Sequence, residues 1–319
     1  DPANLGEEVP RHFLSVLGGQ PLPVSEKGSG RLELADWLAS SKNPLTARVM
    51  VNRIWQHHFG KGLVQTPSDF GVRGRPPTHP ELLDYLAARF IESGWSVKAM
   101  HRAIMLSHAY QQAATENPRA QTLDPNNNLL WSFNRQRLDA EAIRDSMLQV
   151  SGELEPGPGM DHPFPNEALW DFTQHFQFLA NYETRRRSVY VMQQRIRRHP
   201  FFGLFDGADP NATTAERVAS ITPLQALFAM NDPFVQEQAQ TFGTRLLLST
   251  KSDSTRIMIA FRMLYGRDPR REELTEALEY VRAFKAKLGK GSGPSQRDEA
   301  VWTSLARALL ASNEFMFVE

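Results

Sequence analysis

Residues 43–60 read NPLTARVMVNRIWQHHFG, and this stretch carries signals for both ends of a helix. Asn43 is a favourable N-cap with Pro44 at the first turn, and Gly60 stands where a helix ends. At about 100° per residue, Arg48 and Asn52 fall inside an apolar arc of the predicted helix. The arc is formed by Leu45, Val49, Trp55 and Phe59. The stretch therefore predicts a helix that carries two strongly polar side chains towards a helical core.

Similar helical patterns follow along most of the chain. Thr78, with Glu81 three residues later, predicts a capping box, and Thr222 and Asp232 each stand before a first-turn proline. The predicted helices span residues 31–40, 44–59, 78–94, 96–110, 137–152, 222–231, 232–248, 253–266, 271–289 and 298–315. Apolar residues at helical spacing dominate the chain, which favours an all-α class of fold.

One segment alternates in the way a strand does. In RSVYVMQQ, residues 187–194, Val189 and Val191 alternate with their neighbours. Because a single strand cannot bury itself, we expect it in a small hairpin or an isolated strand pair.

The expected architecture is a mainly α, single compact multi-helix domain over residues 31–319, with long wrapping loops and this minor β element. Residues 1–30 are expected to form an extended lead-in segment, and a subdivision near residue 155 is the alternative. The loops at residues 60–77, 109–137 and 152–166 are rich in glycine, proline and asparagine.

Composition limits the classes of function. The chain has 319 residues, 41% of them hydrophobic, and its 36 basic residues balance 36 acidic ones, so no overall positive charge argues for nucleic acid. The absence of cysteine excludes disulfides, thiolate metal sites, cysteine nucleophiles and covalent attachment of a c-type haem. No apolar run of about 18 residues predicts a membrane span. A divalent metal with other ligands stays open.

Seven collinear motifs resemble one known family. They are NPLTARVMVNRIWQHHFGKGLVQTPSDFG, PPTHPELLDYLA, RLDAEAIRDSMLQVSG, RRSVYVMQQR, LFDGADPN, TPLQALFAMND and LLASNEFMFV. Together they are similar to a planctomycete-specific domain of unknown function, domain of unknown function 1553. The resemblance implies that the chain is the C-terminal module of a large exported protein, periplasmic or at the cell surface. It also implies companion domains, often cytochrome-like, and it supplies no activity and no catalytic residues.

The two polar residues of the opening stretch have candidate partners. On the predicted helix at 137–152, Glu141 and Asp145 also fall inside an apolar arc. Because an unpaired buried charge is very costly, we expect Arg48 to pair with Glu141 or Asp145, with Asn52 satisfying the remaining hydrogen bonds. This buried polar network is interpreted as architectural, and an active-site role is the alternative.

A second constellation lies in DHPFPNEALWDFTQHFQF. If residues 166–178 are helical, Glu167, Asp171 and His175 share one face, and they are the catalytic candidates as acid and base. His162, Asp171 and His175 are the candidate ligands of zinc, manganese or iron. Trp170 adds an aromatic platform for a ligand. An ordinary solvated helix face is the alternative.

A third constellation concentrates positive charge in a chain of zero net charge. The candidate ligand-binding residues are Arg185, Arg186, Arg187, Tyr190, Arg195, Arg197 and Arg198, with Trp170. Arginine forks recognise sulfate and carboxylate, so a sulfated or carboxylated polysaccharide is the candidate ligand. Pairing of these arginines with acidic residues of neighbouring elements is the alternative.

Two further patterns are interpreted as structural. In LFDGADPN the spacing of Asp206, Asp209 and Asn211 is similar to that of a calcium loop, but the glycine and distant glutamate of an EF-hand are missing, so an Asx-turn is favoured. His101 and His108 are interpreted as residues of a core edge and of the surface rather than as ligands.

These observations predict an exported, non-catalytic binding and assembly module that docks companion domains and holds an anionic polysaccharide. The alternative is a hydrolase or lyase that acts on polysaccharide through the carboxylates and histidine at 167–175.

Overall fold

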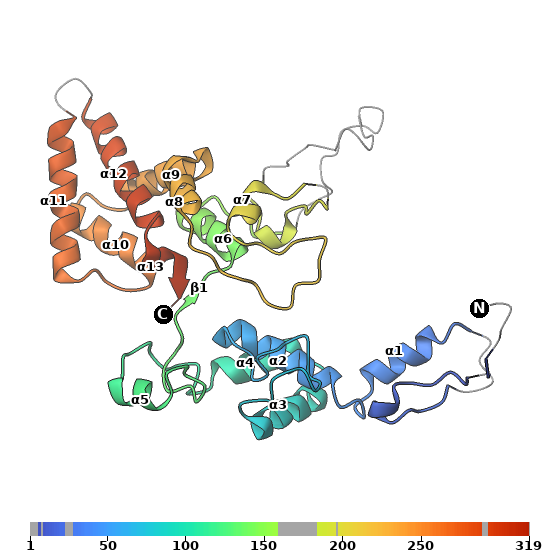
Figure 1. Cartoon of the computed structure of the whole chain (residues 1–319). Helices are drawn as coiled ribbons and strands as arrows, with labels where there is room; N and C mark the ends of the chain where they lie inside the picture. The colour runs from blue at the N-terminus through green and yellow to red at the C-terminus, as the bar shows by residue number, and fades with distance from the viewer. Residues whose placement is uncertain are drawn as a thin grey trace, which may run out of the picture. The chain divides into compact units, whose positions relative to one another are not determined.

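The computed structural model describes residues 6–7, 9–22, 28–158, 184–195, 197–288 and 293–318, and it is mainly helical (Figure 1). Contacts between Cα atoms divide the chain into two compact units: unit 1, Asp1–Asn134 with Glu319, and unit 2, Arg135–Val318. The division lies between Asn134 and Arg135, so the alternative boundary near residue 155 falls inside unit 2.

Unit 1 is built on helices whose ends are set by local chemistry. Its elements are η1 (Ser15–Leu17), α1 (Arg31–Ala39), α2 (Thr46–Phe59), α3 (Pro80–Glu92), α4 (Val97–Met105) and α5 (Pro118–Leu123). Asn43 Oδ1 accepts hydrogen bonds from the backbone N–H groups of Leu45 and Thr46, at 2.9 and 3.2 Å. Gly60 ends α2 with a φ of 76°, a conformation that favours glycine. The predicted end at Gly60 is confirmed, but the predicted start is wrong: the N-cap of α2 is Leu45 rather than Asn43, and Asn43 fastens the turn that precedes the helix.

The predicted capping box at Thr78 is wrong. The N-cap of α3 is His79, which makes no side-chain cap, and the Thr78 hydroxyl instead donates to the carbonyl of Leu63. Because Thr78 also donates its backbone N–H to Leu63, its polar groups fasten the preceding loop rather than the helix.

The core of unit 1 lies between α2, α3 and α4. Its buried apolar residues are Ala47, Val51, Ile54, Trp55, Phe59, Leu63, Val64, Leu83, Leu86, Ala87, Phe90, Met100 and Ile104. They recur at helical spacing, so the three helices bury one face each.

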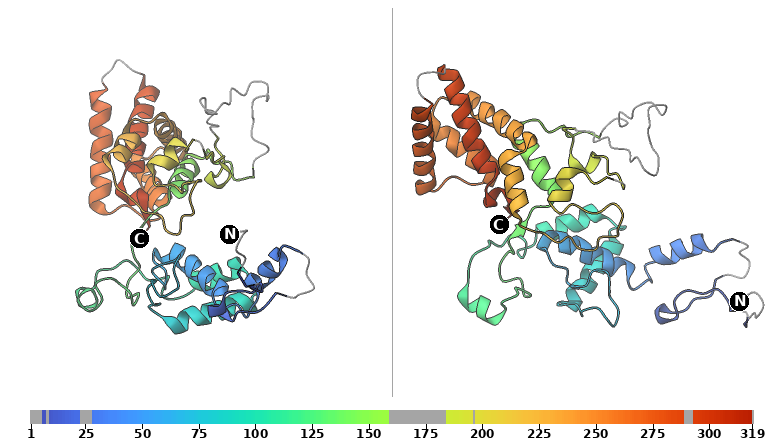
Figure 2. Two further views of the ribbon diagram at one scale, coloured as in Figure 1. Left: turned by 45° about the vertical axis from the view of Figure 1, so that its right-hand side comes forward. Right: turned by 45° about the horizontal axis from the view of Figure 1, so that its top comes forward.

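Unit 2 holds the remaining elements. They are β1 (Gln136–Arg137), α6 (Ala140–Ser151), η3 (Ser188–Tyr190), α7 (Pro200–Leu204), α8 (Pro223–Asn231), α9 (Pro233–Ser249), α10 (Asp253–Tyr265), α11 (Arg271–Lys287), α12 (Pro294–Leu310), α13 (Asn313–Met316) and β2 (Phe317–Val318). In both views of Figure 2 the orange helix α9 runs beside the red helix α12. Gly243 permits this close approach, because a Cβ there would lie 2.8 Å from the backbone N of Thr303.

The two short strands form an antiparallel pair in which Gln136 faces Val318 and Arg137 faces Phe317. The predicted fold class, mainly α with an isolated strand pair, is confirmed, but the predicted strand at 187–194 is wrong. Residues 188–190 form the 3₁₀ helix η3. The backbone N–H of Ser188 donates to Asp145 Oδ1 at 2.8 Å, which removes a donor that a strand ladder would need.

Among the residues that the structure describes, no helix has the length and apolar character needed to cross a membrane.

Candidate functional site

Asp206 is the centre of a polar network in unit 2. It comes directly after the turn that ends α7, with a φ of 62° that is uncommon for a residue other than glycine. Gly207 follows, where a Cβ would lie 2.8 Å from both Cβ and O of Phe202. The chain therefore reverses sharply here, and such strained backbone is kept only where surrounding contacts hold it.

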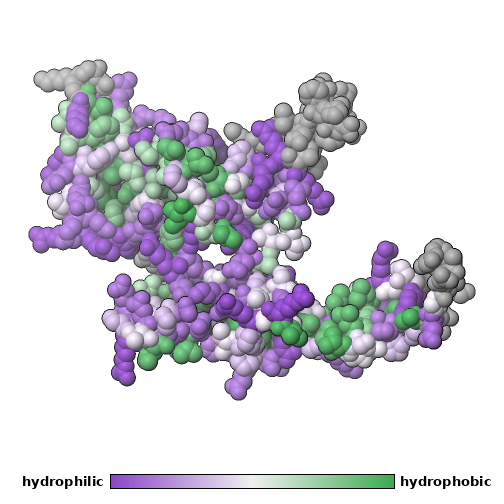
Figure 3. Space-filling model, viewed as in Figure 1, coloured by the Kyte–Doolittle hydropathy of each residue, from purple (hydrophilic) through white to green (hydrophobic). Residues whose placement is uncertain are grey.

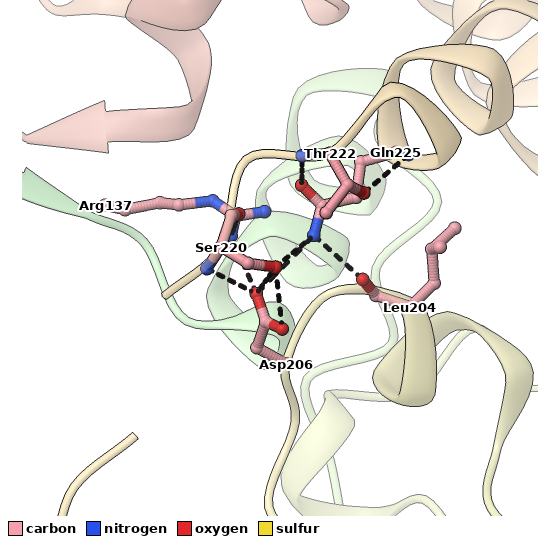
Figure 4. A network of polar contacts seen from close by, with 6 residues as sticks. All are labelled: Arg137, Leu204, Asp206, Ser220, Thr222 and Gln225. Atoms are coloured by element: carbon pink, nitrogen blue, oxygen red, sulfur yellow. Dashed lines mark hydrogen bonds and ion pairs between the residues drawn. The ribbon is translucent and has the colours of Figure 1, made fainter. Parts of the chain in front are cut away.

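The contacts that hold Asp206 come from distant parts of the chain (Figure 4). Its carboxylate accepts hydrogen bonds from the backbone N–H of Ser220 at 2.8 Å, from the Ser220 hydroxyl at 2.9 Å and from Arg137 Nη1 at 3.0 Å. Burial disfavours the charge of Asp206, but these bonds from Ser220 and Arg137 outweigh burial and lower its pKa below the ordinary value. Asp206 is thus an ionised anchor rather than a proton donor.

Gln225 extends the network to the start of α8. Its Nε2 donates to the carbonyl of Leu204 at 2.8 Å, and its Oε1 accepts from the backbone N–H of Thr222 at 3.2 Å. Thr222 in turn caps α8 by accepting from the backbone N–H of Gln225. The capping box predicts a helix start, and here it also binds the first turn of α8 to the end of α7 (Figure 4).

The helix held in this way has apolar side chains on its exposed side. Gln225 and Ala229 are buried, whereas Leu224, Leu227 and Met230 cover an exposed arc of about 120° on the other side. These three residues form the α8 outer face and are 53% to 64% exposed. Val218 and Ile221, in the segment before the helix, are also exposed, at 80% and 75%. Figure 3 shows hydrophobic surface (green) in the part of unit 2 where Figure 1 places α8.

A second anchor, Arg144, holds the segment at residues 184–188. It is only 5% exposed and donates to the carbonyls of Thr184 and Arg186 and to the hydroxyl of Ser188. Burial lowers the pKa of its guanidinium, and Asp145, 3.7 Å away, acts in the opposite direction. Asp145 also accepts from Ser188, so helix α6 fastens this segment through two adjacent side chains.

The predicted arginine cluster lies on and after this segment, and part of its charge is already paired. Arg185 contacts Glu153 and Glu237, the latter at 2.6 Å, and Arg186 lies 3.6 Å from Glu155. Arg198 donates to the carbonyl of Gly207, and Arg197 is half-buried with a partner of its own. Arg187, Tyr190 and Arg195 are exposed. Pairing, the alternative that the sequence left open, therefore accounts for part of the cluster, and the exposed residues stay candidates for ligand binding.

The predicted pairing of Arg48 with Glu141 or Asp145 is wrong. Arg48 Nε donates to Asp84 of α3 at 2.6 Å, with side chains 35% and 57% exposed. Glu141 instead accepts two hydrogen bonds from Arg217.

Asn52 is buried as predicted, but it bonds the backbone of a loop rather than the predicted charge pair. It is fully buried, and its amide both donates to and accepts from the backbone of Val64.

The predicted catalytic and metal residues Glu167, Asp171, His175 and His162, and the platform Trp170, lie outside the described residues. In the part of the chain that is described, no three histidine, aspartate or glutamate side chains gather in a way that could hold a metal ion.

The favoured Asx-turn is confirmed, because Asp209 Oδ1 accepts from the backbone N–H of Asn211 at 2.8 Å.

One polar pair escaped sequence reasoning. His58 Nε2 lies 2.7 Å from His101 Nδ1, between α2 and α4, and burial together with the charges of His101 and His57 lowers the pKa of His58. The two histidines are 43 positions apart, so no local pattern indicates the contact.

Comparison with known proteins gives one match. The family model described as PSD1, protein of unknown function (DUF1553), matches residues 30–281. No curated protein and no solved structure matches the chain.

Proposed function

Because the chain belongs to the PSD1 family of proteins of unknown function (DUF1553), we propose that it is a non-catalytic binding and assembly module that docks companion domains through the α8 outer face. The companions we infer are cytochrome-like domains of the same larger protein, exported to the periplasm or cell surface. The resemblance of the seven sequence motifs supports this inference.

The observation that carries the proposal is the apolar character of the exposed face of α8. A surface helix normally places polar residues opposite its buried stripe, and a helix that is apolar all round is normally buried. Leu224, Leu227 and Met230 instead lie opposite the buried Gln225 and Ala229. Contiguous exposed apolar residues of this kind are typical of a protein interaction site.

The Asp206 network supports the proposal because it fixes the α8 outer face before any partner binds. Ser220 and Thr222 lie within the segment that carries Val218 and Ile221, and both are tied to the network. Ordering this segment in advance lowers the conformational entropy lost on binding, which raises affinity.

A photo-crosslinking amino acid at position 227 tests the proposal in the longer protein. Docking predicts crosslinks from position 227 to a companion domain and none from position 248. Leu248 is the matched control, since it is equally apolar and 83% exposed but lies at the far end of α9, away from the α8 outer face. Leu227→Asp is expected to weaken binding of the separate companion domain about tenfold or more, whereas Leu248→Asp leaves it unchanged. Equal crosslinking at the two positions would overturn the proposal.

An anionic polysaccharide is a second candidate ligand, favoured by the exposed Arg187 and Arg195. Affinity electrophoresis in gels cast with sulfated or carboxylated polysaccharide, at two salt levels, tests it. Salt-sensitive retardation that Arg187→Gln and Arg195→Gln reduce would support binding. Shortened polymer would support the hydrolase or lyase alternative.

A further inference from the structure

Unit 1 contains a cleft of about 460 Å³, and Arg48 is one of the residues that line it. It is lined by the start of α2, by the loop at residues 64–77 and by the start of α3. Its volume lies within the range of roughly 300 to 1,000 Å³ of small-molecule sites. Leu45, Val64, Phe70 and Leu83 give it an apolar lining, so it suits a ligand with an apolar body.

The loop that lines the cleft is fixed by its own hydrogen bonds. The Thr66 hydroxyl donates to the carbonyl of Asp69 at 2.7 Å and accepts from the backbone N–H of Arg75 at 2.9 Å. Gly74 allows the loop to close on itself, because a Cβ there would overlap the backbone carbonyl oxygen of Asp69. Pro76, Pro77 and Pro80 further restrict the backbone. These contacts therefore fix the shape of the cleft.

Charged groups border this apolar lining. Arg48 and Arg75 both line the cleft, and so does Asp84, the ion-pair partner of Arg48. The hydrogen bond from Arg48 lowers the pKa of Asp84, so its carboxylate is ionised at neutral pH. Two guanidinium groups and one carboxylate leave one positive charge, which complements a ligand with a single negative charge.

Both arginines retain donors for such a ligand. Arg48 uses Nε for Asp84 and Nη1 for the carbonyl of Pro44, and Arg75 uses Nη1 for Gln65. Each guanidinium has five N–H donors in a fork that matches a carboxylate. The ion pair of Arg48 is exposed, and exposed pairs contribute little stability, so a ligand can compete with Asp84 at small cost.

We propose that this cleft binds a small organic monocarboxylate with an aromatic or aliphatic body. The apolar body lies against Phe70 and the prolines, and the carboxylate accepts from Arg48 and Arg75. This site is in unit 1 and does not depend on the docking proposed for the α8 outer face of unit 2.

Titration of the isotope-labelled chain with 3-phenylpropionate, followed in its amide NMR spectrum, tests the site. The uncharged control ligand is 3-phenylpropionamide. We expect saturable shifts at residues lining the cleft with the acid and a Kd at least tenfold weaker with the amide. Arg48→Gln and Arg75→Gln should each raise the Kd for 3-phenylpropionate about tenfold. The matched control Arg89→Gln, on α3 and paired with Glu92, should not.

A second ligand identifies the source of the carboxylate. A short peptide that ends in phenylalanine with a free C-terminal carboxylate presents the same group on a chain. Binding at least tenfold tighter than 3-phenylpropionate would assign the cleft to a chain end, and equal or weaker binding to a free organic acid. Equal affinity for acid and amide, or no saturation up to about 10 mM acid, would overturn the proposal.

Discussion

Units 1 and 2 both fasten long irregular segments to helices, but they use different chemistry. In unit 1 the loop after α2 is held by Asn52, a neutral amide whose Nδ2 donates to Val64 O at 3.0 Å and whose Oδ1 accepts from Val64 N at 2.8 Å. In unit 2 the corresponding anchors are ionised: Asp206 holds the segment before α8, and Arg144 holds the segment that includes η3.

The difference predicts how each unit fails. A buried amide that satisfies one donor and one acceptor is neutral, so losing a partner leaves no unpaired charge in the core. An ionised anchor that loses a partner leaves a buried charge uncompensated, which costs more stability. Charged anchors also bind several partners at once, as Arg144 does with three acceptors in the segment at residues 184–188. Unit 2 should therefore be the more sensitive to loss of an anchor and to pH.

Arg144→Met is expected to have the largest effect on stability. It leaves two carbonyls and the carboxylate of Asp145 without their buried cation, which should lower the free energy of unfolding of unit 2 by about 3 to 5 kcal/mol. Hydrogen exchange in increasing denaturant, resolved by mass spectrometry into the two units, measures this. Arg262→Gln is the control, since its ion pair with Asp268 is exposed. Unchanged exchange in unit 2 would refute the anchoring role of Arg144.

Asn52→Leu should give the next largest effect, confined to unit 1. The change strands the buried N–H and C=O of Val64, at a cost of about 2 to 4 kcal/mol. Asn52→Asp retains the acceptor for Val64 N and loses the donor. The same exchange experiment should show unit 1 weakened and unit 2 unaltered. A loss of similar size in both units would remove the distinction between their anchors.

Asp206→Asn tests the charge of the second anchor of unit 2. It replaces charge-assisted bonds to Ser220 and Arg137 by neutral ones, at about 1 to 3 kcal/mol at pH 7. Because the folded pKa of Asp206 lies below 3.8, its contribution in the parent is present above pH 3.8 and is lost as the pH falls through the folded pKa. The difference between parent and variant, measured by denaturant titration at several pH values, should therefore shrink in acid. A difference independent of pH would contradict the charge assignment.

Histidines add a smaller acid sensitivity to both units. Burial, with the nearby charge of Arg144, lowers the pKa of His199 from 6.5 to about 4. The folded state favours the neutral imidazole of His199. Its contribution to the free energy of unfolding is therefore complete above pH 6.5 and is lost as the pH falls from 6.5 to about 4. Allowing for partial exposure, the loss should be about 1 to 2 kcal/mol.

His58 gives unit 1 a loss of the same sign below pH 6.5, since its pKa is also lowered. His199→Gln should reduce the change with pH in the free energy of unfolding of unit 2 and leave that of unit 1 unaltered. Hydrogen exchange between about pH 4 and pH 7 measures both. A variant that keeps the slope of the parent would show that another group of unit 2 titrates in this range.

The helix ends were predictable because their chemistry is local. The signals at Gly60, Thr222 and Asp232 act within four residues, and the structure confirms each of them. The network around Asp206 was not predictable, since Ser220 and Arg137 lie 14 and 69 positions away. The strand predicted at 187–194 failed for the same reason, because a distant carboxylate, Asp145, takes the backbone donor of Ser188.

The helical wheel placed Asn52 correctly in the core and Arg48 wrongly. A wheel treats every turn of a helix as equally covered, but Arg48 lies near the start of α2, which lines the open cleft of unit 1. Its neighbours on the wheel therefore do not bury it. The sequence likewise shows that Leu224, Leu227 and Met230 of α8 are apolar, but it does not show that no neighbouring element buries them.

Arg48→Ala is expected to have the smallest effect. A buried arginine paired across helices would cost about 3 to 5 kcal/mol when removed, as Arg144 should. The pair of Arg48 with Asp84 is exposed on both sides, so its loss should cost about 0 to 1 kcal/mol. Thermal unfolding of the variant and parent, with Arg89→Ala as an exposed control, measures the difference. A loss as large as that of Arg144→Met would mean that an exposed ion pair supports unit 1 as strongly as a buried one supports unit 2, and the contrast between their anchors would then fail.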